Sequence, residues 1–176
     1  MMPQLRLTAK MAKELKVNML NIPSVVTELY DDWYLDVTRI LRKKVFIFMH
    51  IRTRIALAMP SYEIGGVQNL LECFPLLLRE LLNVLGYERL ADEAYSFFSC
   101  RELRINFVKT DDKSTLRYIS EFKFLLQHKA DRHDVINQIL CDEMAKHCLN
   151  HLMKSNLDPK DYTTPLKLLK SLLKDK

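Results

Sequence analysis

Three acidic residues lie around the single tryptophan of the chain and are the first candidates for chemistry. They are Asp31, Asp32 and Asp36, on either side of Trp33. On a helix, Asp32 and Asp36 would stand one turn apart, where two carboxylates can hold a metal ion with Lys109 as an electrostatic partner. Acidic residues early in a helix are also favoured by the helix dipole alone, with Trp33 in the core. We favour this plainer interpretation.

The block Lys109–Ser114 combines basic and hydroxyl side chains. A strand that ends there and is followed by a helix can present backbone N–H groups to an anion, with Lys109 and Lys113 on its flanks. Thr110 and Ser114 are equally typical of ordinary capping at a helix N-terminus. Both interpretations stay open at this point.

Cysteine and histidine gather near the C-terminal end, at Cys141, His147, Cys148 and His151. Thiolate and imidazole are the ligands that zinc prefers. One helix cannot close four ligands around a single ion, however, and the two cysteines also belong to an apolar stripe. We therefore expect packing, no bound metal and no cofactor. The irregular spacing of the four cysteines predicts free thiols.

Two basic clusters are candidates for contact with phosphate groups. They comprise Arg39, Arg42, Lys43 and Lys44 before a predicted strand, and His50, Arg52 and Arg54 around a predicted turn. Together they would form a basic rim. Few aromatic residues are interleaved, so no stacking platform for single-stranded nucleic acid is indicated. Charge runs of this length are usually a solvated surface.

Composition restricts the class of protein. The chain has 176 residues, of which 48% are hydrophobic, and this suits one domain with a substantial core. With three glycines it carries neither a Gly-rich dinucleotide loop nor a Walker-type phosphate loop. The first residues form no apolar run of the secretory type, and charged residues interrupt the longest apolar stretch, 70–85. We expect a cytoplasmic protein without a membrane span, and its net charge of +5 is weak evidence for nucleic acid.

The elements that position these residues follow from hydrophobic patterning. Strands are predicted at 4–8, 45–49, 55–59 and 103–109, and helices at 9–16, 27–42, 70–86, 88–98, 114–128, 131–153 and 166–173. Thr8 should cap the first helix, and Asn69 with Glu72 has the spacing of a capping box. The amphipathic tail helix is too short to be stable alone, so it should dock on the body, a second copy or a partner.

This order predicts an α+β fold. We expect a small, mostly antiparallel sheet of about four strands, including a central hairpin, covered by helices and followed by a helical C-terminal tail. Residues 1–130 would form the α+β core domain, and residues 131–176 a helical extension packed on that core.

Three segments carry a further indication: DDWY at 31–34, VFIFMHIRT at 45–53 and KTDDKSTLRYISEF at 109–122. In this order they resemble an uncharacterised prokaryotic domain family that is often described as plasmid-related. The residues at matching positions are Asp32, Trp33, Thr53, Lys109, Thr110, Lys113, Ser114 and Leu116. The sequence departs from the family's pattern at His50 and over 117–120. The resemblance implies this order of elements and a mobile-element setting, but no catalytic activity.

The absence of an assembled catalytic set favours a non-enzymatic protein-interaction module of a mobile or accessory genetic element. It would bind a protein partner or a second copy through the apolar helix at 70–85 and the tail. The alternative is a nucleic-acid-binding or nucleic-acid-processing protein that uses the basic clusters with Asp32, Asp36 and Lys109. Convergence of Asp32, Lys109 and Ser114 in a basic cleft would favour that alternative. The candidate binding residues are Asp32, Trp33, Arg52, Thr53, Lys109, Thr110, Lys113 and Ser114.

Overall fold

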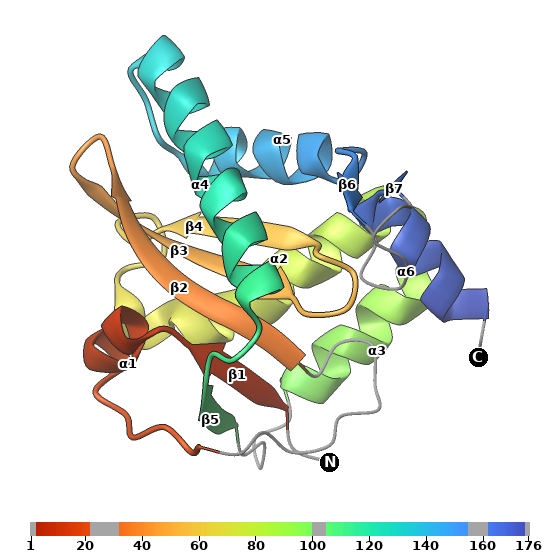
Figure 1. Cartoon of the computed structure of the whole chain (residues 1–176), viewed down its shortest axis with the longest axis horizontal. Coiled ribbons are helices and arrows are strands. Elements are labelled where there is room, and N and C mark those ends of the chain that lie inside the picture. Colours follow the sequence, from red (N-terminus) through yellow and green to blue (C-terminus); the bar gives the residue numbers. More distant parts are fainter. Residues whose placement is uncertain (1–2, 22–31, 100–104, 155–161, 175–176) are drawn as a thin grey trace.

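The computed structural model describes residues 3–21, 32–99, 105–154 and 162–174, and it has an α+β fold (Figure 1). Its central sheet contains β1 (Gln4–Leu7), β2 (Asp32–Ile40), β3 (Lys43–His50), β4 (Ala56–Pro60) and β5 (Asn106–Lys109). The strand order is β4-β3-β2-β1-β5. β1 pairs in parallel with β2 and β5, whereas β2, β3 and β4 pair antiparallel. The sheet is therefore mixed and has five strands, which corrects the expectation of about four mostly antiparallel strands.

The additional strand is β2, where the sequence predicted a helix over 27–42. Residues 27–31 lie outside the described residues, but from Asp32 onward the chain is extended. Trp33 and Val37 point to one face of the sheet, and Tyr34 to the other. Helices cover both faces, so every position from 32 to 37 is buried and the two-residue alternation is hidden.

The hairpin of β3 and β4 was predicted correctly. Val45 pairs with Pro60 and Met49 with Ala56, in antiparallel register. The predicted strand at 103–109 is β5, although Leu103 and Arg104 lie outside the described residues.

Six helices surround the sheet in the described part of the chain. They are α1 (Ala9–Leu15), α2 (Leu70–Val84), α3 (Glu88–Phe98), α4 (Lys113–His133), α5 (Gln138–Cys148) and α6 (Pro165–Lys174), with a short 3-10 turn η1 (Val67–Asn69) and a small ladder of β6 (Met153–Lys154) and β7 (Tyr162–Thr163). Thr8 caps α1 as predicted, whereas the Asn69 side chain makes no cap and donates instead to the Ile64 carbonyl.

The bounds of α4 and α5 differ from the sequence prediction. α4 continues past residue 128 to His133, where Asp134 adopts a left-handed conformation with φ 49° and ends it. Asn137 then caps α5, accepting the Leu140 N–H at 2.9 Å, so α5 begins later than the predicted helix at 131–153. It also ends earlier, at Cys148, and Met153 lies in β6. The expected domain boundary at residue 130 lies inside α4 and stays a prediction.

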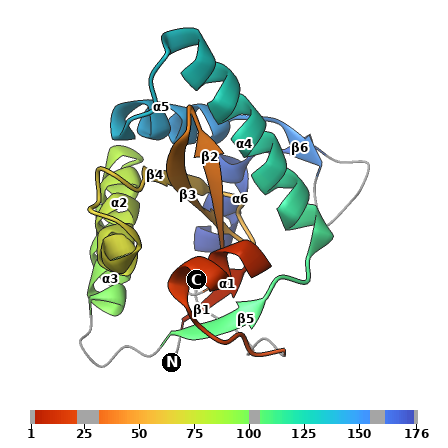
Figure 2. The ribbon, with the colours of Figure 1, turned by 90° about the vertical axis from the view of Figure 1, so that its left-hand side faces the viewer.

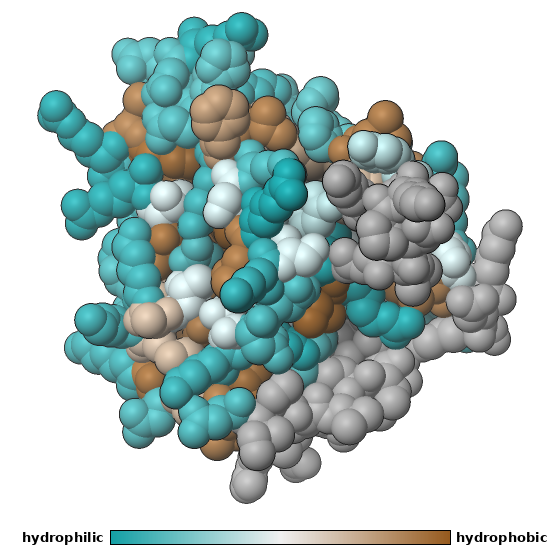
Figure 3. Space-filling model, in the orientation of Figure 1, coloured by the Kyte–Doolittle hydropathy of each residue, from teal (hydrophilic) through white to brown (hydrophobic). Residues whose placement is uncertain are grey.

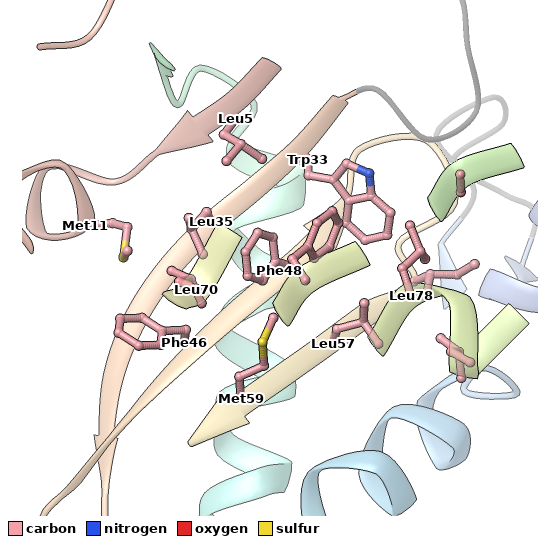
Figure 4. Close-up of a cluster of buried hydrophobic side chains, with 14 of the residues drawn as sticks. Leu5, Met11, Trp33, Leu35, Phe46, Phe48, Leu57, Met59, Leu70 and Leu78 are labelled. Carbon is pink, nitrogen blue, oxygen red and sulfur yellow. The ribbon is translucent and has the colours of Figure 1, made fainter. Parts of the chain in front are cut away.

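The sheet separates two hydrophobic cores (Figure 2). In one of them, α1, α2, α3 and α6 cover Trp33 and Phe48 (Figure 4). The Phe74 ring of α2 stacks on Phe48 at 4.2 Å between ring centres. In the other, α4 and α5 cover Tyr34 and Ile47. Leu169 of α6 is only 1% exposed, so the tail docks on the body of its own chain. Burial of a leucine or phenylalanine side chain such as these contributes about 1.5–3 kcal/mol to the stability of the fold.

Candidate functional site

A buried ion pair joins β1 and β2 on the sheet face beneath α4. Parallel pairing sets Gln4 beside Asp32 and Arg6 beside Tyr34. The Arg6 guanidinium donates to both carboxylate oxygens of Asp32, from Nε at 2.9 Å and from Nη2 at 2.8 Å. Both residues are buried. Asp32, a candidate binding residue from the sequence, is therefore already neutralised by Arg6.

The same arginine reaches the segment that precedes α4. Arg6 also contacts the Asp111 carboxylate, and the Tyr34 hydroxyl donates to that carboxylate at 3.1 Å. The backbone N–H of Asp112 donates in turn to the Tyr34 hydroxyl at 2.7 Å. Burial alone would raise the pKa of Asp111, but the hydrogen bond and the charge of Arg6 outweigh it and hold that pKa below its ordinary value. Burial raises the pKa of Tyr34, which keeps its donating proton.

Arg54 holds the first turn of α4 from the other side. Asp112 is the N-cap of α4, and its carboxylate accepts the Ser114 N–H at 2.8 Å. Arg54 Nη2 lies 3.1 Å from the same carboxylate, and the Thr115 hydroxyl contacts both side chains. Burial would raise the pKa of Asp112, yet Thr115 and Arg54 hold it below its ordinary value. The carboxylate of Asp112 thus takes the place that an external anion would use at this helix end.

Asp36 has partners of its own on the same sheet face. Its carboxylate accepts the Thr8 hydroxyl at 2.6 Å and the Val37 N–H at 2.8 Å, and it pairs with Lys123 of α4. Four residues of extended strand separate Asp36 from Asp32, roughly 13 Å. The hypothesis that Asp32 and Asp36 hold one metal ion together is therefore wrong. Within the described ranges, no group of three or more His, Cys, Asp or Glu side chains could hold a metal ion.

The candidate residues of the block 109–114 differ in their exposure. Lys109 is exposed at the end of the edge strand β5, and Lys113 is exposed at the start of α4. Thr110 is half-buried between them. Asp32 is buried and paired, so Asp32, Lys109 and Ser114 do not converge in a basic cleft.

The two basic clusters lie at opposite ends of β3, because Lys43 opens that strand and His50 closes it. Arg39 and Arg42 are exposed at the β2–β3 turn, whereas Arg54 is buried in the network beneath α4. The expectation of one continuous basic rim is therefore wrong.

His50 and Thr53 form a buried turn at the end of β3. The Thr53 N–H donates to His50 Nδ1 at 3.2 Å, and the Thr53 hydroxyl lies 2.8 Å from the same nitrogen. Burial, together with the charges of Arg52 and Arg54, lowers the pKa of His50 to about 3. The Trp33 ring lies 5.1 Å from the imidazole, and Arg52 is exposed beyond them. His50 is therefore neutral at physiological pH.

Cys73, Cys141 and Cys148 carry free thiols, as predicted, and Cys100 lies outside the described residues. Burial raises the pKa of Cys148 to about 11 and that of Cys141 further, so both thiols stay protonated.

A groove with apolar walls runs beside α4, and we call it the α4 groove. It consists of two hollows that share Glu121, Leu125 and His151. Phe124 lines its rim and is 71% exposed. Figure 3 looks onto this side of the molecule, where hydrophobic surface is interspersed among hydrophilic side chains.

A comparison with protein families finds a model that matches residues 4–168, described as a domain of unknown function (DUF6933). The chain belongs to this family. The DUF6933 match spans all five strands of the central sheet and both helical layers. A comparison with curated proteins finds no match. In the described part of this DUF6933 domain, no helix has the length and apolar character needed to span a membrane.

The sequence analysis did not identify the cations that neutralise the candidate acids, which are Arg6 for Asp32 and Lys123 for Asp36. One feature of the sequence could have indicated these partners: Gln4 and Arg6 alternate with leucines in β1, so this strand has one polar face. A polar face on a central strand requires polar partners from the covering layer.

Proposed function

We propose that this DUF6933 domain is a non-enzymatic protein-interaction module whose binding face is the α4 groove. The single observation that carries the proposal is Phe124, a large aromatic side chain that is 71% exposed at the rim of an apolar groove. Exposed aromatic residues beside such grooves are typical of protein contact sites.

The internal pairing of the acids supports a non-enzymatic role. Asp32 is held by Arg6, Asp36 by Lys123 and Thr8, and Asp112 by Arg54 and Thr115, so these carboxylates are engaged in holding the fold together.

The groove replaces the apolar segments on which the interaction hypothesis first rested. The buried side chains of α2, such as Leu70 and Phe74, and Leu169 of α6 belong to one intramolecular core. Because these residues already pack within the chain, their apolar surface is not free for a partner. The exposed face of α4 is the better candidate.

The partner we propose is a second copy of this chain, packed antiparallel along α4 about a two-fold axis. Lys113, Arg117, Ser120, Phe124 and Asp131 share one exposed helical stripe with positive charge at its N-terminal end and negative charge at its C-terminal end. An antiparallel pairing centred near residue 122 sets Lys113 opposite Asp131 of the second copy and Phe124 opposite the small Ser120. Self-complementarity of this kind is what a two-fold interface requires.

Sedimentation velocity across the micromolar range tests this interface, because one pair of helices gives a small contact area and a modest affinity. We expect a dimer for the wild-type protein and a monomer for Phe124→Asp. Ile139→Asp is the matched control, because Ile139 is 70% exposed on α5 and does not line the groove. A wild-type protein that stays monomeric, or equal dissociation by both substitutions, would refute the proposal.

Nucleic-acid binding is a second candidate, and the β2–β3 turn favours it. Arg39 and Arg42 are exposed there, and Lys43 lies over the Tyr62 ring at 4.5 Å. Lys44, which follows the turn, forms an ion pair with Glu14 of α1 at 2.6 Å. Fluorescence anisotropy with a short DNA duplex should then show binding that weakens steeply with salt and is lost in Arg39→Ala/Arg42→Ala. Salt-independent binding, or none, would exclude this candidate.

The setting we propose is a mobile or accessory genetic element in the cytoplasm. The mobile-element setting rests on the resemblance to plasmid-related proteins. The cytoplasmic location rests on the free thiols of Cys73, Cys141 and Cys148, since the cytoplasm keeps thiols reduced.

A further inference from the structure

On the sheet face opposite α4, a small cavity lies where the end of the sheet meets the helices. Its walls include Trp33 of β2 and His50 of β3, with Leu78 and Leu82 of α2, Leu90 of α3 and Leu169 of α6. The cavity volume is about 20 Å³, which is room for about one water-sized group. Apart from His50 and Thr53 the walls are hydrocarbon or indole, so the cavity is apolar with one polar end.

The polar end has a defined chemistry. A backbone N–H can only donate, so the bond from Thr53 N to His50 Nδ1 makes Nδ1 an acceptor and leaves the ring proton on Nε2. His50 is 2% exposed, and among the described residues its Nε2 has no hydrogen-bond partner. Nε2 is the ring nitrogen farther from the backbone, and His50 pairs with Trp33 on the sheet face that the leucines of α2, α3 and α6 cover. A buried N–H without an acceptor is costly, and a ligand that accepts from it removes that cost.

We propose that this cavity, which we call the Trp33–His50 cavity, binds a small uncharged molecule with an apolar body and one hydrogen-bond acceptor. The acceptor receives the Nε2 proton of His50, and the apolar body lies against Trp33 and the leucines. A charged ligand is disfavoured, because the apolar walls and the neutral imidazole supply no opposite charge.

Leu169 is the side chain that controls access. It is the only wall of the cavity, among the described residues, that comes from α6. A ligand larger than one water-sized group enters when Leu169 moves aside, so shortening this side chain enlarges the site without removing the donor.

The test uses acetophenone and ethylbenzene, two probes of similar shape that differ by a carbonyl oxygen. The readout is the indole N–H signal of Trp33 in NMR spectra, because the chain has one tryptophan. We expect saturable shifts with both probes in Leu169→Ala and weaker binding in the wild-type protein. Acetophenone should bind about tenfold more tightly than ethylbenzene, the value of one hydrogen bond to a buried donor.

Two further variants assign the effect. Leu169→Ala/His50→Leu should bind both probes equally, because the donor is gone. Leu169→Phe fills the cavity and should bind neither. Equal affinities for the two probes in Leu169→Ala would overturn the proposal. So would the absence of a saturable shift in both the wild-type protein and Leu169→Ala, whatever the other variants do.

Discussion

Buried charge is the most distinctive feature of this protein at the scale of residues. Arg6 and Asp32 lie between a sheet and a helix, where an ion without a partner would cost several kcal/mol. Two-point contact between the guanidinium and the carboxylate offsets that cost and fixes the orientation of both groups. The pair explains why a carboxylate in a promising sequence context is not available to a ligand.

Arg6→Met should therefore destabilise the protein by about 3–5 kcal/mol in urea unfolding, because Asp32 remains buried without its cation. The double variant Arg6→Met/Asp32→Leu should recover most of this loss, since no lone charge remains. Arg89→Ala is the control, because the Arg89–Glu93 pair is exposed, and its effect should stay within about 0.5 kcal/mol. A single variant as stable as the double variant would contradict the assignment.

Stability should also depend on pH through His50. Its pKa is about 3 in the folded protein and 6.5 in an unfolded chain, so the unfolded state takes up a proton first as the pH falls. The free energy of unfolding should then decrease by about 1 kcal/mol per pH unit between about pH 6 and pH 5. In His50→Asn this slope should disappear, because the amide oxygen can still accept the Thr53 N–H but cannot titrate. An unchanged slope in the variant would assign the effect elsewhere.

At the scale of elements, the segments with one clear signal were predictable. α3 begins and ends at the predicted residues, and the β3–β4 hairpin follows from two short apolar runs around a turn. β2 was not predictable as a strand, because burial on both faces removed its alternation. Its turn also lacks glycine or asparagine: Leu41 and Arg42 themselves adopt positive φ angles of 48° and 65°.

The N-terminus of α4 depends on one carboxylate with two tasks, and substitution of Asp112 separates them. Asp112→Asn keeps an oxygen for the Ser114 N–H but removes the charge that faces Arg54, whereas Asp112→Ala removes both. In thermal and urea unfolding, the wild-type protein should be more stable than Asp112→Asn, and Asp112→Asn more stable than Asp112→Ala. The two variants should differ by about 1 kcal/mol, the contribution of the cap. Equal stability of Asn and Ala would show that the cap contributes nothing.

At the scale of the whole molecule, the sheet divides the protein into two cores with different surfaces around them. The α+β class was predictable from the order of elements, and docking of the tail from its leucine spacing. The exposed stripe of α4 that contains Lys113, Phe124 and Asp131 was not predictable, because the sequence does not show which elements pack against each face of a helix. The ion pairs beneath α4 join residues up to 105 positions apart in the chain, a separation that no local pattern encodes.

Exchange of charges along α4 tests the central claim, self-association through this face, most directly. Lys113→Asp and Asp131→Lys should each weaken the dimer about tenfold in sedimentation experiments, because a two-fold axis places each like-charge pair in the interface twice. The double variant Lys113→Asp/Asp131→Lys restores opposite charges and should return the dimer to nearly wild-type affinity. A wild-type protein that is monomeric throughout, or a double variant weaker than either single one, would contradict the account.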